Sequence, residues 1–317
     1  MPFVSPSRAN LSAGRVSEIG LPQILMGIVL TIAAIDCVWA MVGRFDVDYS
    51  SYAKLALLSA ALWLVSLYYG RFRDAPGIAA MLYGSAFLIV LSAGLSVLNY
   101  FLLTVAGPRI DPQLARLDAA IGINWPAMMA AVSTHPLVNI ILRTAYSSVL
   151  PQVALLIIGL GWRNNVAAIN AFCLALAMSA AVTIAFWTAF PSFGAFSVYE
   201  LPMDVAQRVG PELDAHYARE LVRLLVTGPG PISPSELKGL IGFPSFHAAM
   251  AVLVVLYGRS LPYACWAFLI WNLIVLVATP VHGGHFVVDV IAGAGVALAA
   301  AAATSRIAAV AERRERT

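Results

Sequence analysis

The chain has 317 residues, of which 61% are hydrophobic and only 11% are charged, with a formal net charge of +3. A soluble domain usually has about 25% charged residues, so this composition and the mean hydropathy of +0.84 indicate a protein that lies largely in a membrane. No basic–aromatic patch appears, which argues against a nucleic-acid-binding protein. The three cysteines all lie in apolar runs and are expected to be buried hydrophobic side chains rather than disulfide partners or metal ligands.

A polar segment, 1–20, precedes the first apolar run. No small-residue cleavage site follows it closely, so the run from Leu21 is expected to be a retained helix rather than a signal peptide. Runs of about 20 apolar residues predict membrane spans. Eight spans are expected, with approximate bounds 21–42, 53–70, 77–104, 138–162, 168–190, 244–259, 261–280 and 284–304. The segment 117–134 is too short and too broken to span, and an interfacial or re-entrant helix is expected there.

The positions of the arginines predict the orientation. The short connections after the second, fourth and sixth expected spans carry basic residues, and so does the tail 305–317. The basic residues of these three connections are Arg71, Arg73, Arg163 and Arg259. Because cytoplasmic loops are enriched in Lys and Arg, both termini are expected to be cytoplasmic. Two long connections, 105–137 and 191–243, then lie on the extracytoplasmic side, as functional loops tend to be long.

Within the second long connection, 211–225 has the pattern of an amphipathic helix. Leu213, Tyr217, Leu221 and Leu224 share one face, and a Gly-Pro-Gly-Pro run at 228–231 ends the helix. Two interpretations stay open at this point. The helix lies on the membrane surface, or it covers an active site and controls the entry of lipid.

All five histidines lie on the extracytoplasmic side of this arrangement. The run Gly-Phe-Pro-Ser-Phe-His at 242–247 places Ser245 where it can cap the following helix, with His247 in the first turn. The free N–H groups at such a helix start favour a bound anion. A histidine beside a phosphate tends to stay protonated, which suits a general acid. A capped helix with an interfacial histidine is the structural alternative.

A second run, His-Gly-Gly-His-Phe-Val-Val-Asp, occupies 282–289. His285 and Asp289 are four residues apart, so on a helix they share one face. A carboxylate bonded to one imidazole nitrogen presents the other nitrogen as a nucleophile, and Gly283 and Gly284 allow substrate to approach closely. A buried ion pair that locks the last helix is the structural alternative.

These residues carry a resemblance to a known family. The run 244–247 followed by 285–289 resembles two signature motifs of the type 2 phosphatidic acid phosphatase superfamily. The resemblance implies that His285 is a phosphohistidine nucleophile, that Asp289 orients it, that His247 is the acid/base, and that no metal or cofactor is needed. It also implies a six-helix catalytic core over about 77–304, to which the two helices in 21–76 are an addition. Ser245 and Gly284 are expected to contact the substrate.

Three departures from the phosphatase pattern resemble the inositol phosphorylceramide synthase-like branch of that superfamily. Phe246 replaces the glycine of the usual Pro-Ser-Gly-His, and Thr279 stands where an arginine is expected six residues before the nucleophile. No Lys-x6-Arg-Pro motif appears at the end of the preceding span, where 190–195 reads Phe-Pro-Ser-Phe-Gly-Ala. The expected function is therefore phosphoryl or head-group transfer on a lipid phosphate or phospholipid, with an alcohol as a possible acceptor, in a bacterial inner or plasma membrane.

A transferring phosphoryl group needs a cation near its oxygens. Arg143, about one turn inside its span and followed by Tyr146, is the first candidate for this substrate-binding role. Other candidates lie in the outer loop: Arg208, Arg219, Arg223 and Lys238.

Three other functions stay open. A plain lipid phosphate phosphatase would release phosphate without an alcohol acceptor. A proton-coupled transporter would use the histidines as relays, but it predicts polar residues spread along several spans. A zinc enzyme would take ligands from His247, His282, His285 and Asp289, although nothing in their spacing requires them to converge.

Overall fold

The structure, a computed structural model, describes residues 20–43 and 45–314, and its elements are helices. The segment 1–19 and residues 315–317 of the tail, both expected to be cytoplasmic, lie outside the described residues. The α-helices are α1 (Leu21–Gly43), α2 (Tyr49–Phe72), α3 (Pro76–Leu102), α4 (Asp111–Ala120), α5 (Trp125–Ser133), α6 (Pro136–Ser147), α7 (Val149–Trp162), α8 (Val166–Ala189), α9 (Met203–Val209), α10 (Ala215–Thr227), α11 (Phe246–Gly258), α12 (Ala264–His282) and α13 (Val287–Arg314). Two short 3₁₀ turns cover Leu103–Val105 and Ala195–Ser197.

Six of the described helices are long and apolar enough to cross a membrane: α1, α2, α3, α8, α12 and α13. The chain is thus an all-helical, multi-pass membrane protein, as its composition predicted. The helices α7 and α11 correspond to the other two expected spans and have only 14 and 13 residues. A helix of 14 residues is about 21 Å long, which is shorter than the hydrocarbon core of about 30 Å.

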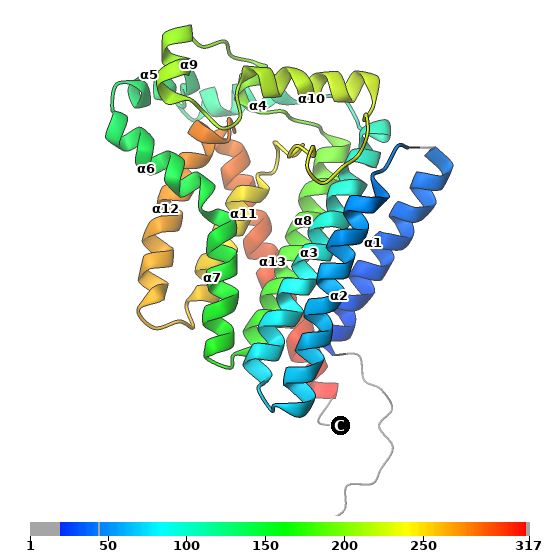
Figure 1. Ribbon diagram of the computed structural model, residues 1–317. Helices are drawn as coiled ribbons and strands as arrows, with labels where there is room; N and C mark the ends of the chain where they lie inside the picture. Colours follow the sequence, from blue (N-terminus) through cyan, green and yellow to red (C-terminus); the bar gives the residue numbers. More distant parts are fainter. Residues whose placement is uncertain (1–19, 44, 315–317) are drawn as a thin grey trace, which may run out of the picture.

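The expected span 138–162 is wrong as one continuous helix, because the chain breaks between α6 and α7 at Ser148. Pro151 has no N–H to donate to the carbonyl of Ser147, and its ring clashes with that carbonyl in a regular helix. The axes of α5 and α6 also differ by 115°, the geometry of a broken span or a re-entrant loop. The segment 105–147 therefore folds as short helices at one end of the bundle (Figure 1).

The long helices stand side by side, and α8 is the most buried of them (Figure 1). It packs against α3, α11 and α13. The helices α3 and α7 approach closely, and a side chain on Gly77 would collide with the carbonyl of Gly161. Small residues allow helix backbones to approach in this way.

The first two helices pack on α3 and border a cavity of about 390 Å³. Asp36 and Tyr52 line this cavity, and Asp36 Oδ1 and the Tyr52 hydroxyl have no hydrogen-bond partner among the described residues. The connection between α1 and α2 reaches the long loop after α10, because Val47 forms an isolated parallel bridge with Ile232.

The helix expected at 211–225 begins only at Ala215 in the structure, because the Asp214 carboxylate accepts a hydrogen bond from Tyr217 N (2.8 Å) and caps the helix there. Leu213 precedes the helix. The buried face of α10 carries Leu221 and Leu224, which pack against buried side chains of the bundle and of the following loop. Its apolar face is thus occupied by protein, and α10 lies across the end of the bundle (Figure 1).

A substitution pair tests the α3–α7 crossing. Gly77→Ala should lower the free energy of unfolding by about 1–3 kcal/mol, since the new methyl group overlaps the Gly161 carbonyl. Gly27→Ala in α1, where a methyl group meets no atom within 4 Å, should leave it unchanged or raise it by up to about 1 kcal/mol. Unfolding of both variants in detergent micelles measures the difference. Equal stability of the two variants would contradict a tight crossing.

Candidate active site

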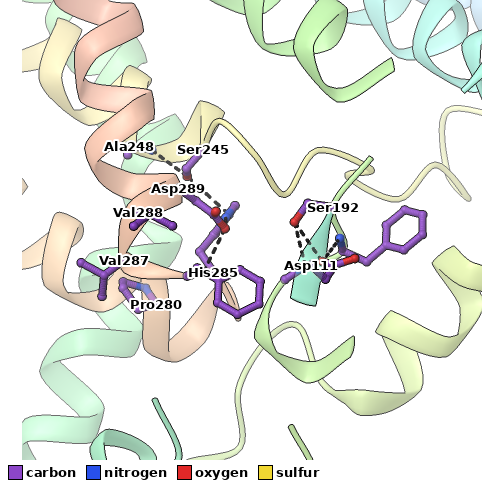
Figure 2. A network of polar contacts seen from close by, with 12 residues as sticks. Asp111, Ser192, Ser245, Ala248, Pro280, His285, Val287, Val288 and Asp289 are labelled. Carbon is purple, nitrogen blue, oxygen red and sulfur yellow. Dashed lines mark hydrogen bonds and ion pairs between the residues drawn. The ribbon is translucent and has the colours of Figure 1, made fainter. Parts of the chain in front are cut away.

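The first part of the site is the start of α11. Ser245 is fully buried and is the N-cap residue, with its Oγ accepting a hydrogen bond from Ala248 N at 3.3 Å. Its own backbone N–H donates to the carbonyl of Asp289 (3.0 Å). The cap therefore ties the start of α11 to the first turn of α13, as Figure 2 shows.

The second part is the turn between α12 and α13. His285 lies before α13 rather than within it, because the helix begins at Val287. The expected contact with Asp289 still forms, with His285 Nδ1 at 3.3 Å from Asp289 Oδ2. The same Oδ2 accepts a hydrogen bond from Phe286 N (2.9 Å). Asp289 thus reaches back from the first helical turn, as an acidic residue of a capping box does.

The two ring nitrogens of His285 have different partners. Nδ1 faces Asp289, and Nε2 lies 3.4 Å from Ser245 Oγ (Figure 2). A carboxylate holds the proton on Nδ1, which leaves the Nε2 lone pair available. Since Asp289 is fully buried and His285 is 6% exposed, water competes little with this arrangement.

His247 lies in the first turn of α11, as expected. Its Nε2 donates to the backbone carbonyl of Tyr146 (2.8 Å), and its ring stacks on the Tyr146 ring with centroids 4.2 Å apart. Tyr146 therefore fixes the orientation of His247. In this tautomer Nδ1 is the nitrogen that remains for a substrate.

Both histidines line one cavity of about 360 Å³. Phe246 and Tyr146 lie beside them on its wall. Much of the remaining lining is apolar and comes from α3, α7 and α8, with Leu88, Leu91, Leu150, Val153, Leu176 and Ile184. The cavity thus joins two imidazoles to a space that suits a hydrocarbon chain.

Two buried aspartates that the motifs did not identify hold the site together. Asp118 of α4 accepts hydrogen bonds from Val287 N (2.8 Å) and Val288 N (2.9 Å), so it caps α13 directly after His285. Asp111 Oδ1 accepts hydrogen bonds from Ser192 Oγ and from the backbone N–H groups of Phe193 and Gly194. In the sequence, Asp118 was visible only as an acidic residue of the broken segment 117–134, and Asp111 only as one of the charges in the connection 105–137.

The loop that Asp111 holds, 192–195, supports the turn that carries His285. Ala195 N donates to the carbonyl of Gly284 (2.6 Å). Gly194 and Gly284 both have positive φ, +81° and +61°, and a side chain on Gly194 would collide with that carbonyl. Gly284, expected at the substrate, thus contacts this loop and lies in a small side cavity beside His285 rather than on the wall of the main cavity.

Arg143, the first candidate for the phosphate cation, does not line the main cavity. Its guanidinium donates to the carbonyls of Val209 and Gly210 and so fixes the end of α9. His135 and His216 are exposed. His282 is fully buried, and neither of its ring nitrogens has a hydrogen-bond partner among the described residues.

The alternative zinc set is not assembled. Among residues 20–43 and 45–314, no group of three or more His, Cys, Asp or Glu side chains is arranged to hold a metal ion. His247 and His285 share a cavity, whereas His282 is not on its wall. The geometry fits nucleophilic and acid–base chemistry on two imidazoles.

Comparison with known families gives one match. A family model described as the PAP2 superfamily matches residues 112–303, which is more than half of the chain. No curated protein and no solved structure matches the chain significantly. The matched range contains Ser245, His247, His285 and Asp289. The division into two additional helices and a core over 77–304 stays a prediction.

The cap formed by Asp118 can be tested without an activity assay. Asp118→Ala leaves two N–H groups at the start of α13 without their acceptor, so it should lower the free energy of unfolding by about 1–3 kcal/mol. It should also speed hydrogen exchange at Val287 and Val288. Asp204→Ala, which removes an exposed ion pair with Arg208, is the control and should change stability by less than about 0.5 kcal/mol. Unchanged exchange at both valines would contradict the cap.

Proposed function

Because the chain belongs to the PAP2 superfamily, whose members act on phosphate esters as phosphatases or phosphotransferases, we propose that it is a membrane enzyme that transfers a phosphate-bearing group of a lipid through a phosphohistidine. The observation that carries this proposal is the placement of His285, with Nδ1 on Asp289 and Nε2 beside Ser245 on the wall of a largely apolar cavity.

In the first step, the Nε2 lone pair of His285 attacks phosphorus. The bond between phosphorus and the leaving oxygen breaks, and protonated His247 gives a proton to that oxygen. Asp289 stabilises the positive charge that develops on the His285 ring. The Ser245 hydroxyl rotates away from Nε2 as the phosphorus approaches.

In the second step, His247 takes a proton from an acceptor hydroxyl. The acceptor oxygen attacks phosphorus, the N–P bond breaks, and His285 regains its lone pair. Water as the acceptor gives hydrolysis, and an alcohol gives transfer. The two outcomes differ in the acceptor and not in the catalytic residues.

Thr279 and Phe246 are two of the positions at which this chain departs from the phosphatase pattern. They support transfer to an alcohol, as in the inositol phosphorylceramide synthase-like branch. Thr279 is buried and donates to Val275 O of its own helix (2.8 Å), so it does not replace a phosphate-binding arginine. Phe246 lines the cavity beside His247, where the phosphatase pattern has glycine. An aromatic ring there narrows the space next to the acid and shields it from water.

Turnover by purified variants tests the proposal. The protein would be incubated with labelled lipid phosphates and phosphodiesters, with and without inositol, glycerol or a lipid alcohol. His285→Ala should lower kcat by at least about 10³-fold, as expected for a nucleophile, and His247→Ala by about 10²–10⁴-fold. The exposed His135 supplies the matched control, His135→Ala, which should have wild-type activity. Rapid denaturation of the wild type during turnover, at alkaline pH because acid hydrolyses the P–N bond, should trap labelled phosphohistidine.

Each other outcome of this experiment has a defined meaning. Undiminished turnover by His285→Ala would exclude it as the nucleophile. Phosphate release at the same rate without any alcohol would favour a plain phosphatase. Absence of turnover by the wild type with every substrate would favour the transporter.

We also propose that the site faces the extracytoplasmic side. The connections that carry Arg71, Arg73, Arg163 and Arg259 lie at the end of the bundle opposite α10 (Figure 1), and cytoplasmic loops are enriched in such residues.

Cysteine labelling in intact cells tests this orientation. In a variant that lacks the three native cysteines, Ser235→Cys in the loop after α10 should react with a membrane-impermeant maleimide. Ser260→Cys, in the connection between α11 and α12, should react only after permeabilisation. Both serines are exposed, so the reverse pattern would contradict the proposed orientation.

A further inference from the structure

The proposed chemistry needs a positive charge that neither histidine supplies throughout the reaction. A phosphoryl group in transfer carries negative charge on its non-bridging oxygens, and that charge requires a fixed cation nearby. His247 gives up its proton in the first step, and His285 becomes bonded to phosphorus. The positions where the family resemblance predicts arginine or lysine do not provide one, since Thr279 is neutral.

Lys238 lies on the wall of the catalytic cavity, together with His247 and His285. We infer that Lys238 is the cation that binds the phosphate group of the substrate and compensates its charge during transfer. This inference rests on the proposed function and assigns to Lys238 a role that the sequence pattern left open.

The backbone at Lys238 is held by two tyrosines. Lys238 N donates to the Tyr100 hydroxyl (2.7 Å), and the Tyr217 hydroxyl donates to the carbonyl of Gly239 (2.6 Å). Burial raises the pKa of Tyr217 above its usual value, so its hydroxyl stays a neutral donor. Both bonds reduce the freedom of the backbone at 238–239. The Cα–Cβ bond of Lys238 is therefore positioned before substrate binds.

The loop that contains Lys238 is also fixed on either side. Ile232 exchanges backbone hydrogen bonds with Asp46 and Asp48 in the connection between α1 and α2. Gly242 N donates to the carbonyl of Ser192 (3.0 Å), in the loop that supports the turn that carries His285. The loop that contains Lys238 is thus attached at Ile232 to the connection between α1 and α2. It is attached at Gly242 to the loop beside His285, and Lys238 lies between these two positions.

The charge of Lys238 is available for a substrate. Among residues 20–43 and 45–314, no carboxylate lies within 4.0 Å of its ammonium group. The nitrogen instead lies 5.5 Å from the centroid of the Tyr217 ring. Such a cation–π contact costs far less to give up than an ion pair with a carboxylate in a partly buried site. The lysine can therefore extend toward a phosphate oxygen.

None of the described arginines lines the cavity, and three of them have other partners. Arg143 is bonded to two carbonyls, and Arg109 is paired with the buried Asp111 at 2.7 Å. Arg223 is paired with Glu220, and its hydrogen bond lowers the pKa of that carboxyl group. These pairs leave Lys238 as the cation that the described part of the chain offers to the cavity.

Turnover of Lys238 variants provides the first test, with full-length protein in lipid nanodiscs. Lys238→Gln should lower kcat/KM by about 10²–10³-fold, as loss of a charge-stabilising group does. Lys238→Arg, which keeps the charge, should restore kcat/KM to within about tenfold of the wild type. Arg219→Gln, at an exposed position on α10, is the matched control and should have no effect. Thermal unfolding shows whether each variant is folded, and Lys238→Met replaces Lys238→Gln if the latter is unstable.

Binding of orthovanadate, a phosphate-like anion, provides a second test that needs no turnover. Lys238→Gln should weaken binding by about tenfold or more, since a charge-assisted hydrogen bond is lost, whereas Arg219→Gln should not. If Lys238→Gln keeps wild-type turnover and binding while His285→Ala is inactive, the inference fails and the proposed function stands. If the wild type turns over no substrate, the proposed function fails, and vanadate binding alone decides whether Lys238 forms an anion site.

Discussion

The site depends first on the buried carboxylate of Asp118. It accepts the backbone hydrogen bonds of Val287 and Val288, and so fixes the start of α13 immediately after His285. Inside a membrane protein, free N–H groups at a helix start are costly, because no water replaces the missing acceptor. The position of α13 in turn sets Asp289, which orients His285 and accepts the hydrogen bond of Phe286 N. One carboxylate from a distant short helix thus fixes the turn that carries His285.

The site also requires that the charges of its buried side chains be compensated, because little water reaches them. The Asp289 carboxylate accepts hydrogen bonds from His285 and from Phe286 N, and Asp111 is compensated by Arg109 and by backbone donors. Buried charges that lack such partners are expensive. Lys238 differs from these groups, since it has a ring beside it rather than a carboxylate. A positive charge that is not paired with a carboxylate can bind an anionic substrate.

The sequence predicted the local parts of this arrangement and missed the distant ones. The Ser245 cap and the contact of His285 with Asp289 were predictable, because helix caps and contacts four residues apart have short-range signatures. The break before α7 was also present in the sequence, as Pro151, although a continuous apolar run concealed it. The contacts of Asp118 and Arg143 span 169 and 66 residues, and no local pattern encodes a partner at such a distance. The same reason explains why Arg143 was expected at the substrate.

The contact between Asp118 and α13 also bears on how the protein is made. Membrane helices are inserted as the chain is synthesised, from the N-terminus onward. Asp118 enters the nascent protein long before Val287 exists, so its acceptor oxygens need other hydrogen-bond donors until the last helix is made. The contact of His285 with Asp289 and the cap formed by Asp118 are then completed together. A chain that ends before α13 lacks Asp289 and both backbone donors to Asp118, so the contact between His285 and Asp289 cannot form in it.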